Sequence, residues 1–114
     1  MRAAIILPAI AATVFLAGCS QSVPKCGDAE SVNLVKQIAD REMAKQLGAD
    51  AAKFFSYEVE AIRTTSTNEQ TGAHECAADL KVKGKNGVDS SLPITYTVEK
   101  TDDGKQFYVQ VFGL

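Results

Sequence analysis

Residues 26–48, "CGDAESVNLVKQIADREMAKQLG", decide the fold, because this segment carries the clearest helical period of the chain. Its apolar residues recur at steps of three and four, which places them along one side of a helix. Asp28 precedes the pattern as a typical N-cap, and Gly48 follows it as a typical C-cap. The sequence predicts one amphipathic helix, whose apolar stripe consists of Val32, Val35, Ile38, Ala39, Met43 and Leu47.

Four later segments alternate between apolar and polar residues, as strands with one buried face do. Polar turns separate them, and two of these turns carry Asn86-Gly87 and Asp103-Gly104, dipeptides that favour tight hairpins. Pro93 predicts that the third strand starts there or lies at an edge. The predicted inward residues are Phe55, Tyr57, Val59 and Ala61; Cys76, Ala78, Leu80 and Val82; Leu92, Ile94, Tyr96 and Val98; and Phe107, Val109 and Val111.

The order of one helix followed by four strands with short turns predicts an α+β fold. The apolar stripe of the helix and the apolar face of the sheet each need a cover, and each is the natural cover for the other. We therefore expect one N-terminal helix lying across a four-stranded antiparallel meander. In architecture alone, this arrangement is similar to the cystatin-like helix-on-sheet proteins.

The chain begins with a short apolar segment that predicts a signal peptide. Arg2 is the only charge before Lys25, and residues 3–16 are apolar apart from Thr13, which is shorter than a bilayer-spanning helix. The next residues, Leu16-Ala17-Gly18-Cys19, resemble the lipobox of bacterial lipoproteins. The resemblance implies cleavage after residue 18, lipidation of Cys19, and, because Ser20 rather than Asp follows, sorting to the outer membrane. The alternative is an ordinary secretory leader that is cut near a cysteine.

This interpretation divides the chain into a signal peptide (1–18), a lipidated tether (19–25) and a single α+β domain (26–114). With Cys19 lipidated, Cys26 and Cys76 remain, and an even pair in an oxidising compartment predicts a disulfide. Free or metal-binding thiols are the alternative. His74, the only histidine, shares a strand face with Cys76, but three ligands without a CxxC pair do not make a zinc site, so no metal is predicted.

Charge and motifs narrow the function classes. After loss of Arg2 the chain has 11 Lys and Arg against 14 Asp and Glu, and no basic run, so nucleic acid is not an expected partner. No hydrolase, metalloprotease or nucleotide-binding motif is present, and no cofactor is predicted. His74 could form a nucleophilic pair with Ser56 or Ser66, but no sequence spacing favours such a pair. The carboxylate pairs Glu58/Glu60 and Asp102/Asp103 are ordinary strand and turn residues. The sequence does not predict an enzyme.

The last strand holds the candidate binding residues. Tyr108, Gln110 and Phe112 are out of phase with its inward set, so two aromatic side chains should face outward in polar surroundings. We expect a non-catalytic, membrane-anchored lipoprotein that binds another envelope protein, as inhibitors, immunity proteins, exclusion proteins and secretion accessories do. A small-ligand-binding periplasmic lipoprotein is the alternative, and a degenerate enzyme using His74 is a third possibility. The sequence does not indicate an oligomeric state.

Overall fold

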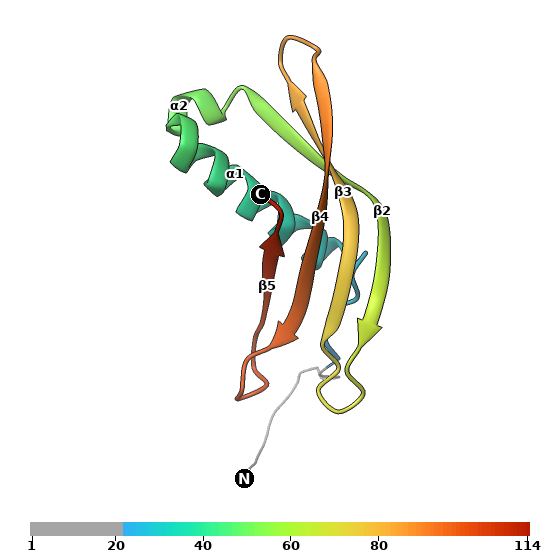
Figure 1. Ribbon diagram of the computed structural model, residues 1–114. Helices are drawn as coiled ribbons and strands as arrows, with labels where there is room; N and C mark the ends of the chain where they lie inside the picture. The colour runs from blue at the N-terminus through green and yellow to red at the C-terminus, as the bar shows by residue number, and fades with distance from the viewer. Residues whose placement is uncertain (1–21) are drawn as a thin grey trace.

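The computed structural model describes residues 22–114. Helix α1 (Ala29–Leu47) and the short helix α2 (Ala49–Ala52) are followed by the strands β2 (Phe55–Thr67), β3 (His74–Gly84), β4 (Asp89–Lys100) and β5 (Phe107–Phe112). The strands form one antiparallel sheet in the order β2-β3-β4-β5, and α1 lies across one face of it (Figure 1). The predicted α+β architecture, one helix on a four-stranded antiparallel meander, is confirmed.

The core lies between α1 and the face of the sheet that carries the predicted inward residues. Central strands β3 and β4 supply most of it, since each has a neighbour on both sides. Tyr96, Ala78 and Val98 have no exposed surface, and Val35 of α1 is equally buried. The buried cluster consists of Val23, Cys26, Val35, Ala39, Tyr57, Cys76, Ala78, Leu80, Ile94, Tyr96 and Val98.

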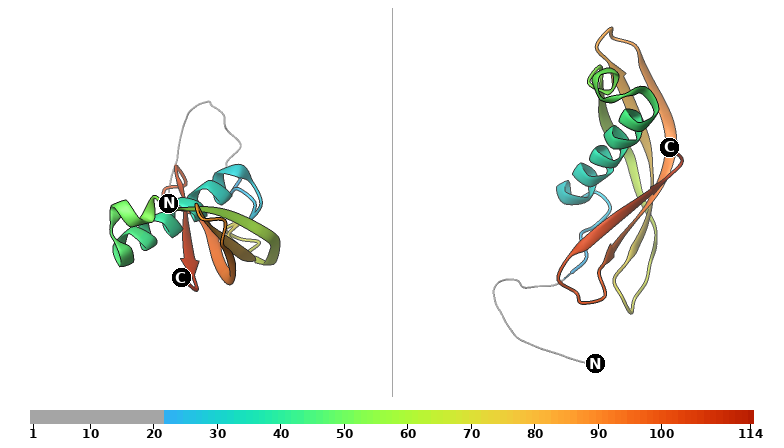
Figure 2. Two further views of the ribbon diagram at one scale, coloured as in Figure 1. Left: turned by 90° about the horizontal axis from the view of Figure 1, so that it is seen from above. Right: turned by 90° about the vertical axis from the view of Figure 1, so that its left-hand side faces the viewer.

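Helix α1 packs along a narrower seam than its sequence predicts. The buried positions are Ser31, Val35 and Ala39, four residues apart, whereas Val32 and Ile38 are half-buried. Leu47, predicted to face the core, is 52% exposed. In Figure 2 the sheet is curved and the helix crosses it obliquely, so the last turn of α1 lies away from the strands. A straight helix therefore keeps only one row of residues against the curved sheet.

The ends of α1 differ in detail from the expected caps. Asp28 is the N-cap residue but makes no side-chain capping bond, because its carboxylate accepts the backbone N–H of Lys25 at 2.9 Å. Gly48 ends the helix with φ 93° and ψ 155°, which is outside the left-handed helical region, while its N–H donates to Ala44 at 2.8 Å. A glycine is required at this position because the φ angle is positive.

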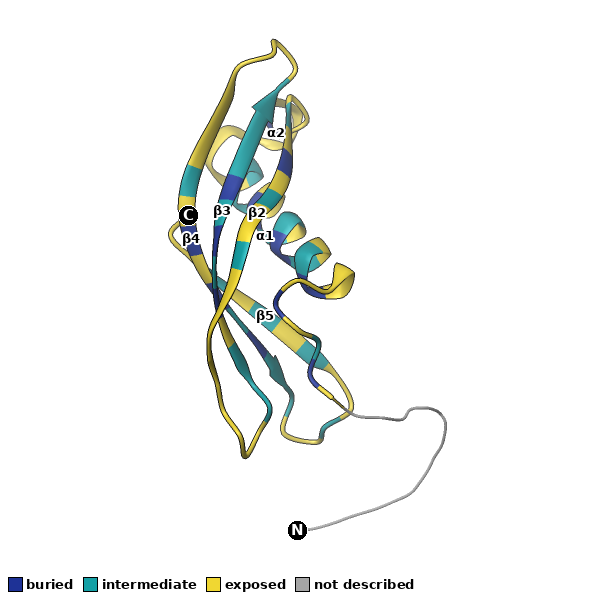
Figure 3. Ribbon diagram, turned by 90° about the vertical axis from the view of Figure 1, so that its right-hand side faces the viewer, coloured by how far each residue is buried: buried dark blue, intermediate teal, exposed yellow. Residues whose placement is uncertain are grey.

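Two irregularities bend the edge strand β2. Glu60 pairs with Asp79 and Arg63 with Ala77, so Ala61 and Ile62 together oppose the single residue between those partners. A second register shift lies between Thr64 and Ser66. The first bulge explains why Ala61, predicted to face inward, is exposed, while Ile62 packs against the core in its place. Beyond the bulges, β2 is exposed as far as Thr67, as Figure 3 shows.

Ala61 adopts φ 54°, the only positive φ among the non-glycine residues that the structure describes. We predict that Ala61→Gly raises the free energy of unfolding by about 0.5–1 kcal/mol, because glycine relieves a left-handed conformation that is unfavourable for alanine. Urea unfolding followed by circular dichroism measures this change. Ala77→Gly, on β3 and without a positive φ, is the control and should destabilise the protein by a similar amount. A destabilising Ala61→Gly would contradict the assigned bulge.

Pro93 lies inside β4, which starts four residues earlier at Asp89, so the prediction of a strand start at Pro93 is wrong. The alternative prediction, that Pro93 lies at an edge of the sheet, is correct for this part of β4. Pairing with β5 covers β4 only from Thr95 to Lys100, whereas pairing with β3 continues to Asp89. At Pro93, β4 therefore has a neighbour on one side only, which is where a residue without an N–H is tolerated.

Val23 and Pro24, upstream of the disulfide, already belong to the packed part of the chain. Val23 is 6% exposed and joins the core cluster, with Gly72 of the β2–β3 turn close to its side chain. The described packing thus begins three residues before the predicted domain boundary at residue 26. The predicted signal peptide (1–18), Cys19 and the first part of the predicted tether lie outside the described residues.

Candidate interaction surface

Strand β5 presents its residues with the predicted phase. Phe107, Val109 and Val111 are half-buried and pack against the core, whereas Tyr108, Gln110 and Phe112 are exposed. Tyr108 keeps 39% and Phe112 53% of its surface accessible. The structure thus shows the exposure that we predicted for these three side chains. Their role as a binding site stays a prediction.

The neighbours of these side chains on β4 are polar. Tyr108 pairs with Glu99, Gln110 with Thr97, and Phe112 with Thr95. The hydroxyl of Tyr108 donates to Glu99 at 3.3 Å, and the negative charge of Glu99 raises the pKa of this tyrosine above its ordinary value. Tyr108 is thus held along the strand by its carboxylate neighbour, with the ring left accessible.

Charged residues cover the same face of the sheet toward β2. Lys83 pairs with Glu58 at 3.2 Å, and Lys81 pairs with Asp89 at 3.7 Å. The hydrogen bond and positive charge of Lys83 lower the pKa of Glu58. Exposed pairs of this kind contribute little to stability. They make this face of β2 and β3 strongly polar, so the two aromatic side chains of β5 stand out from it.

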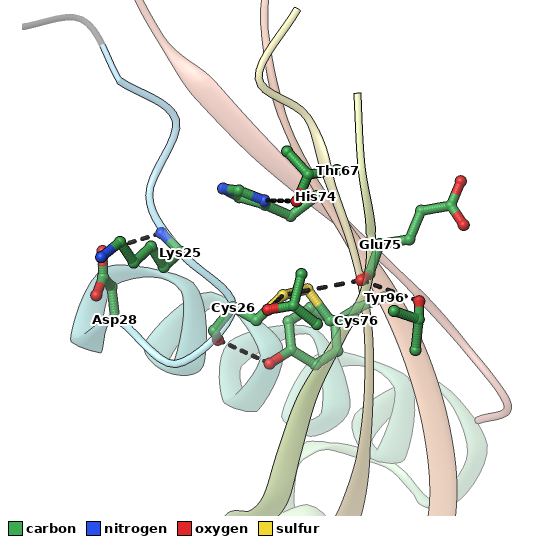
Figure 4. The surroundings of a disulfide bond; sticks show 10 residues. Lys25, Cys26, Asp28, Thr67, His74, Glu75, Cys76 and Tyr96 are labelled. Carbon is green, nitrogen blue, oxygen red and sulfur yellow. Dashed lines mark hydrogen bonds between the residues drawn. A yellow bond between two sulfur atoms is a disulfide. The ribbon is translucent and has the colours of Figure 1, made fainter. Parts of the chain in front are cut away.

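The Cys26–Cys76 disulfide is present, as predicted, with its Cα atoms 5.9 Å apart. It joins the segment before α1 to the central strand β3 (Figure 4). Both cysteines are 1% exposed. The hydroxyl of Tyr96 donates to the carbonyl of Cys26 at 2.7 Å, so a second link holds the same segment to β4. Burial raises the pKa of Tyr96.

Of the catalytic candidates, Ser66 and His74 line one hollow, whereas Ser56 lies at the other end of β2. His74 lies at the start of β3, and its Nδ1 is 2.9 Å from the hydroxyl of Thr67 on β2. Neither Ser56 nor Ser66 is its hydrogen-bond partner. Within residues 22–114, no group of three or more His, Cys, Asp or Glu side chains is placed to hold a metal ion. In the same range, no helix is both long and apolar enough to cross a membrane.

No protein-family model, curated protein or solved structure matches this chain. The surfaces themselves are therefore the basis for assigning a function. Sequence reasoning missed one of them, a hollow of about 170 Å³ between the C-terminal half of α1 and the sheet. Its existence depends on where β5 stops and how α1 crosses the strands, and no local motif encodes either property.

Proposed function

We propose that the protein is a non-catalytic, lipid-anchored module that binds another protein of the bacterial cell envelope. The observation that carries the binding role is the pair of accessible aromatic side chains, Tyr108 and Phe112, on an otherwise polar sheet face. Accessible aromatic residues surrounded by polar groups are typical of protein interfaces. The proposed site consists of Tyr108, Gln110 and Phe112.

The anchor and location in this proposal rest on the sequence. Leu16-Ala17-Gly18-Cys19 follows an apolar stretch as the lipobox of bacterial lipoproteins does, and Ser20 favours the outer membrane, facing the periplasm. Acylation at Cys19 would keep the domain at the membrane surface, because two or more acyl chains together give stable binding. A buried disulfide suits this oxidising compartment.

We predict that Cys19→Ser abolishes lipidation, because the substituted side chain offers no thiol for the thioether bond to diacylglycerol. Cells expressing the full chain would be labelled with a fatty-acid probe, and their membranes would be separated from soluble material. The wild type should carry label and sediment with outer membranes. Cys19→Ser should lose the label and the membrane association. A variant that still takes up label in the membrane fraction would refute the proposed anchor.

We predict that Tyr108→Ser with Phe112→Ser abolishes capture of the partner in cross-linked envelopes and leaves the fold intact. Both side chains are exposed and lie outside the core cluster, so the midpoint of thermal unfolding should fall by only a few degrees. The half-buried Val109, on the same strand with the opposite phase, gives a matched control: Val109→Ser should lower the midpoint more. A drop of roughly 10 °C in the double variant, about 2 kcal/mol for a domain of this size, would mark these residues as core and remove the site.

A further inference from the structure

A second surface lies on the opposite face of the sheet, where α1 and β4 diverge. The hollow of about 170 Å³ there is lined by Met43 and Glu42 of α1, Tyr57 of β2, Val82 of β3, Leu92 of β4, and Leu114. Leu114, two residues after the end of β5, is one of these lining residues. The hollow therefore continues the line of β5.

The edge of β4 is free beside this hollow. Pairing with β5 ends at Thr95 and Phe112, so residues 89–94 of β4 pair with β3 alone. A Cβ built on Gly113, just past the end of β5, would lie 3.0 Å from the carbonyl oxygen of Pro93, so this carbonyl points to the free side. Because backbone groups alternate along an antiparallel strand, the N–H and C=O groups of Ser91 and Asp89 point to the free side too.

The floor of the hollow contains an unsatisfied polar group. Tyr57 is 9% exposed, and its buried hydroxyl has no hydrogen-bond partner among the described residues. Because this hydroxyl is itself buried, a ligand in the hollow reaches it only when the Tyr57 side chain shifts, and the bond then formed satisfies a group whose unpaired state is unfavourable. Burial, and secondarily the charge of Asp40, raise the pKa of Tyr57, so its hydroxyl keeps its proton and can donate.

The rim of the hollow is acidic. Glu42 lines it and makes no ion pair with any residue between 22 and 114. Asp40 lies near Tyr57. Asp89 does not add to this rim, because it pairs with Lys81 on the other face of the sheet. A basic side chain on the ligand would therefore find a complementary charge.

We infer that the free edge of β4 and the adjoining hollow bind a short extended segment of a partner protein, with apolar and basic side chains on one face. The segment adds to the sheet as a continuation of β5, pairing with Asp89 and Ser91. Its apolar side chains fill the space between Met43 and Leu92, and its basic residue meets Glu42. A small apolar molecule or a helix would not pair with the strand edge, so the exposed backbone favours an extended peptide.

This binding site is additional to the proposed function and does not include Tyr108, Gln110 or Phe112. An experiment can therefore refute either proposal without refuting the other. The test selects a phage-displayed library of random decapeptides against the full-length chain in detergent. The selected peptides should share apolar residues at alternate positions and a Lys or Arg on the same face. A fluorescein-labelled peptide with the consensus sequence then gives affinities by anisotropy.

Ser91→Pro is the decisive variant, because it removes one N–H that points away from β3 and leaves the pairing with β3 unchanged. It should weaken peptide binding about tenfold or more, whereas the matched Ser91→Ala should not change it. Tyr57→Phe and Glu42→Lys should each weaken binding about fivefold, and Glu42→Lys remains informative if Ser91→Pro does not fold. Tyr108→Ser with Phe112→Ser should bind the peptide as the wild type does. The inference would be overturned if the selection enriched no peptide, or if the enriched sequences had helical spacing. It would also be overturned if these variants did not change the affinity, or if the protein formed a dimer that excludes the peptide.

Discussion

Replacing Cys26 and Cys76 together by alanine is expected to lower the free energy of unfolding by about 4 kcal/mol. The disulfide closes a loop with a sequence separation of 50, and a loop of that length restricts the unfolded chain by about this amount on the chain-entropy account. Small domains are typically stable by about 5–15 kcal/mol, so the variant should lose a quarter or more of the stability that such a domain has. Urea unfolding of both proteins, followed by circular dichroism, measures the difference.

The reduced wild type is the control for this experiment, because it lacks the bond and keeps both cysteine side chains. It should behave as the double alanine variant does, and both should show a steeper dependence on urea, since the unfolded chain exposes more surface without the bridge. A loss below about 1 kcal/mol in both would mean that the bond from Tyr96 to the Cys26 carbonyl holds this segment alone.

Tyr96→Ala is expected to be the most damaging single substitution in the core. Tyr96 has no exposed surface, and it lies on β4 between Cys76 of β3 and Val111 of β5. Truncating a buried aromatic side chain costs about 3–5 kcal/mol, and the buried carbonyl of Cys26 would also lose its donor. We expect a protein that is largely unfolded at room temperature, as loss of near-ultraviolet circular dichroism would show.

Two milder variants keep this prediction testable if Tyr96→Ala yields no folded protein. Tyr96→Phe removes only the hydrogen bond to Cys26 and should cost about 1–3 kcal/mol. Tyr57→Phe removes a buried hydroxyl that has no partner among residues 22–114, so it should leave stability unchanged or raise it slightly. The opposite order of these two variants in thermal unfolding would contradict the hydrogen bonding described here.

The regular parts of the fold follow from local sequence patterns. The three- and four-residue period of residues 29–47 and the two-residue period of β3, β4 and β5 depend only on which face is buried. The disulfide could be predicted because just two cysteines remain after the proposed lipidation site. The outward phase of Tyr108 and Phe112 was predictable for the same reason as the strands, since each step along a strand reverses the side-chain direction.

The features that no local pattern predicts are those set by tertiary geometry. The residues around Ala61 in the sequence are those of an ordinary strand. Only the register between β2 and β3 produces the bulge and the positive φ at this residue. Ser31 is polar in sequence, yet it is fully buried because the seam of α1 on the curved sheet runs through it. The free edge of β4 depends on β5 being half as long, with six residues against twelve. The alternation of apolar and polar residues in β4 and β5 does not predict this difference in length.

The position of the disulfide also determines how the molecule would carry a mechanical load. A pull applied at residue 22 reaches Cys26 and passes through a covalent bond into β3, before it can act on α1. From β3 the force spreads through β4 to β5, across the pairing of β4 with β3 and the shorter pairing of residues 95–100 with β5. If a partner is held on β5 while the chain is held upstream of Cys26, α1 and β2 lie outside the path of tension. The helix then keeps its packing while the sheet bears the strain.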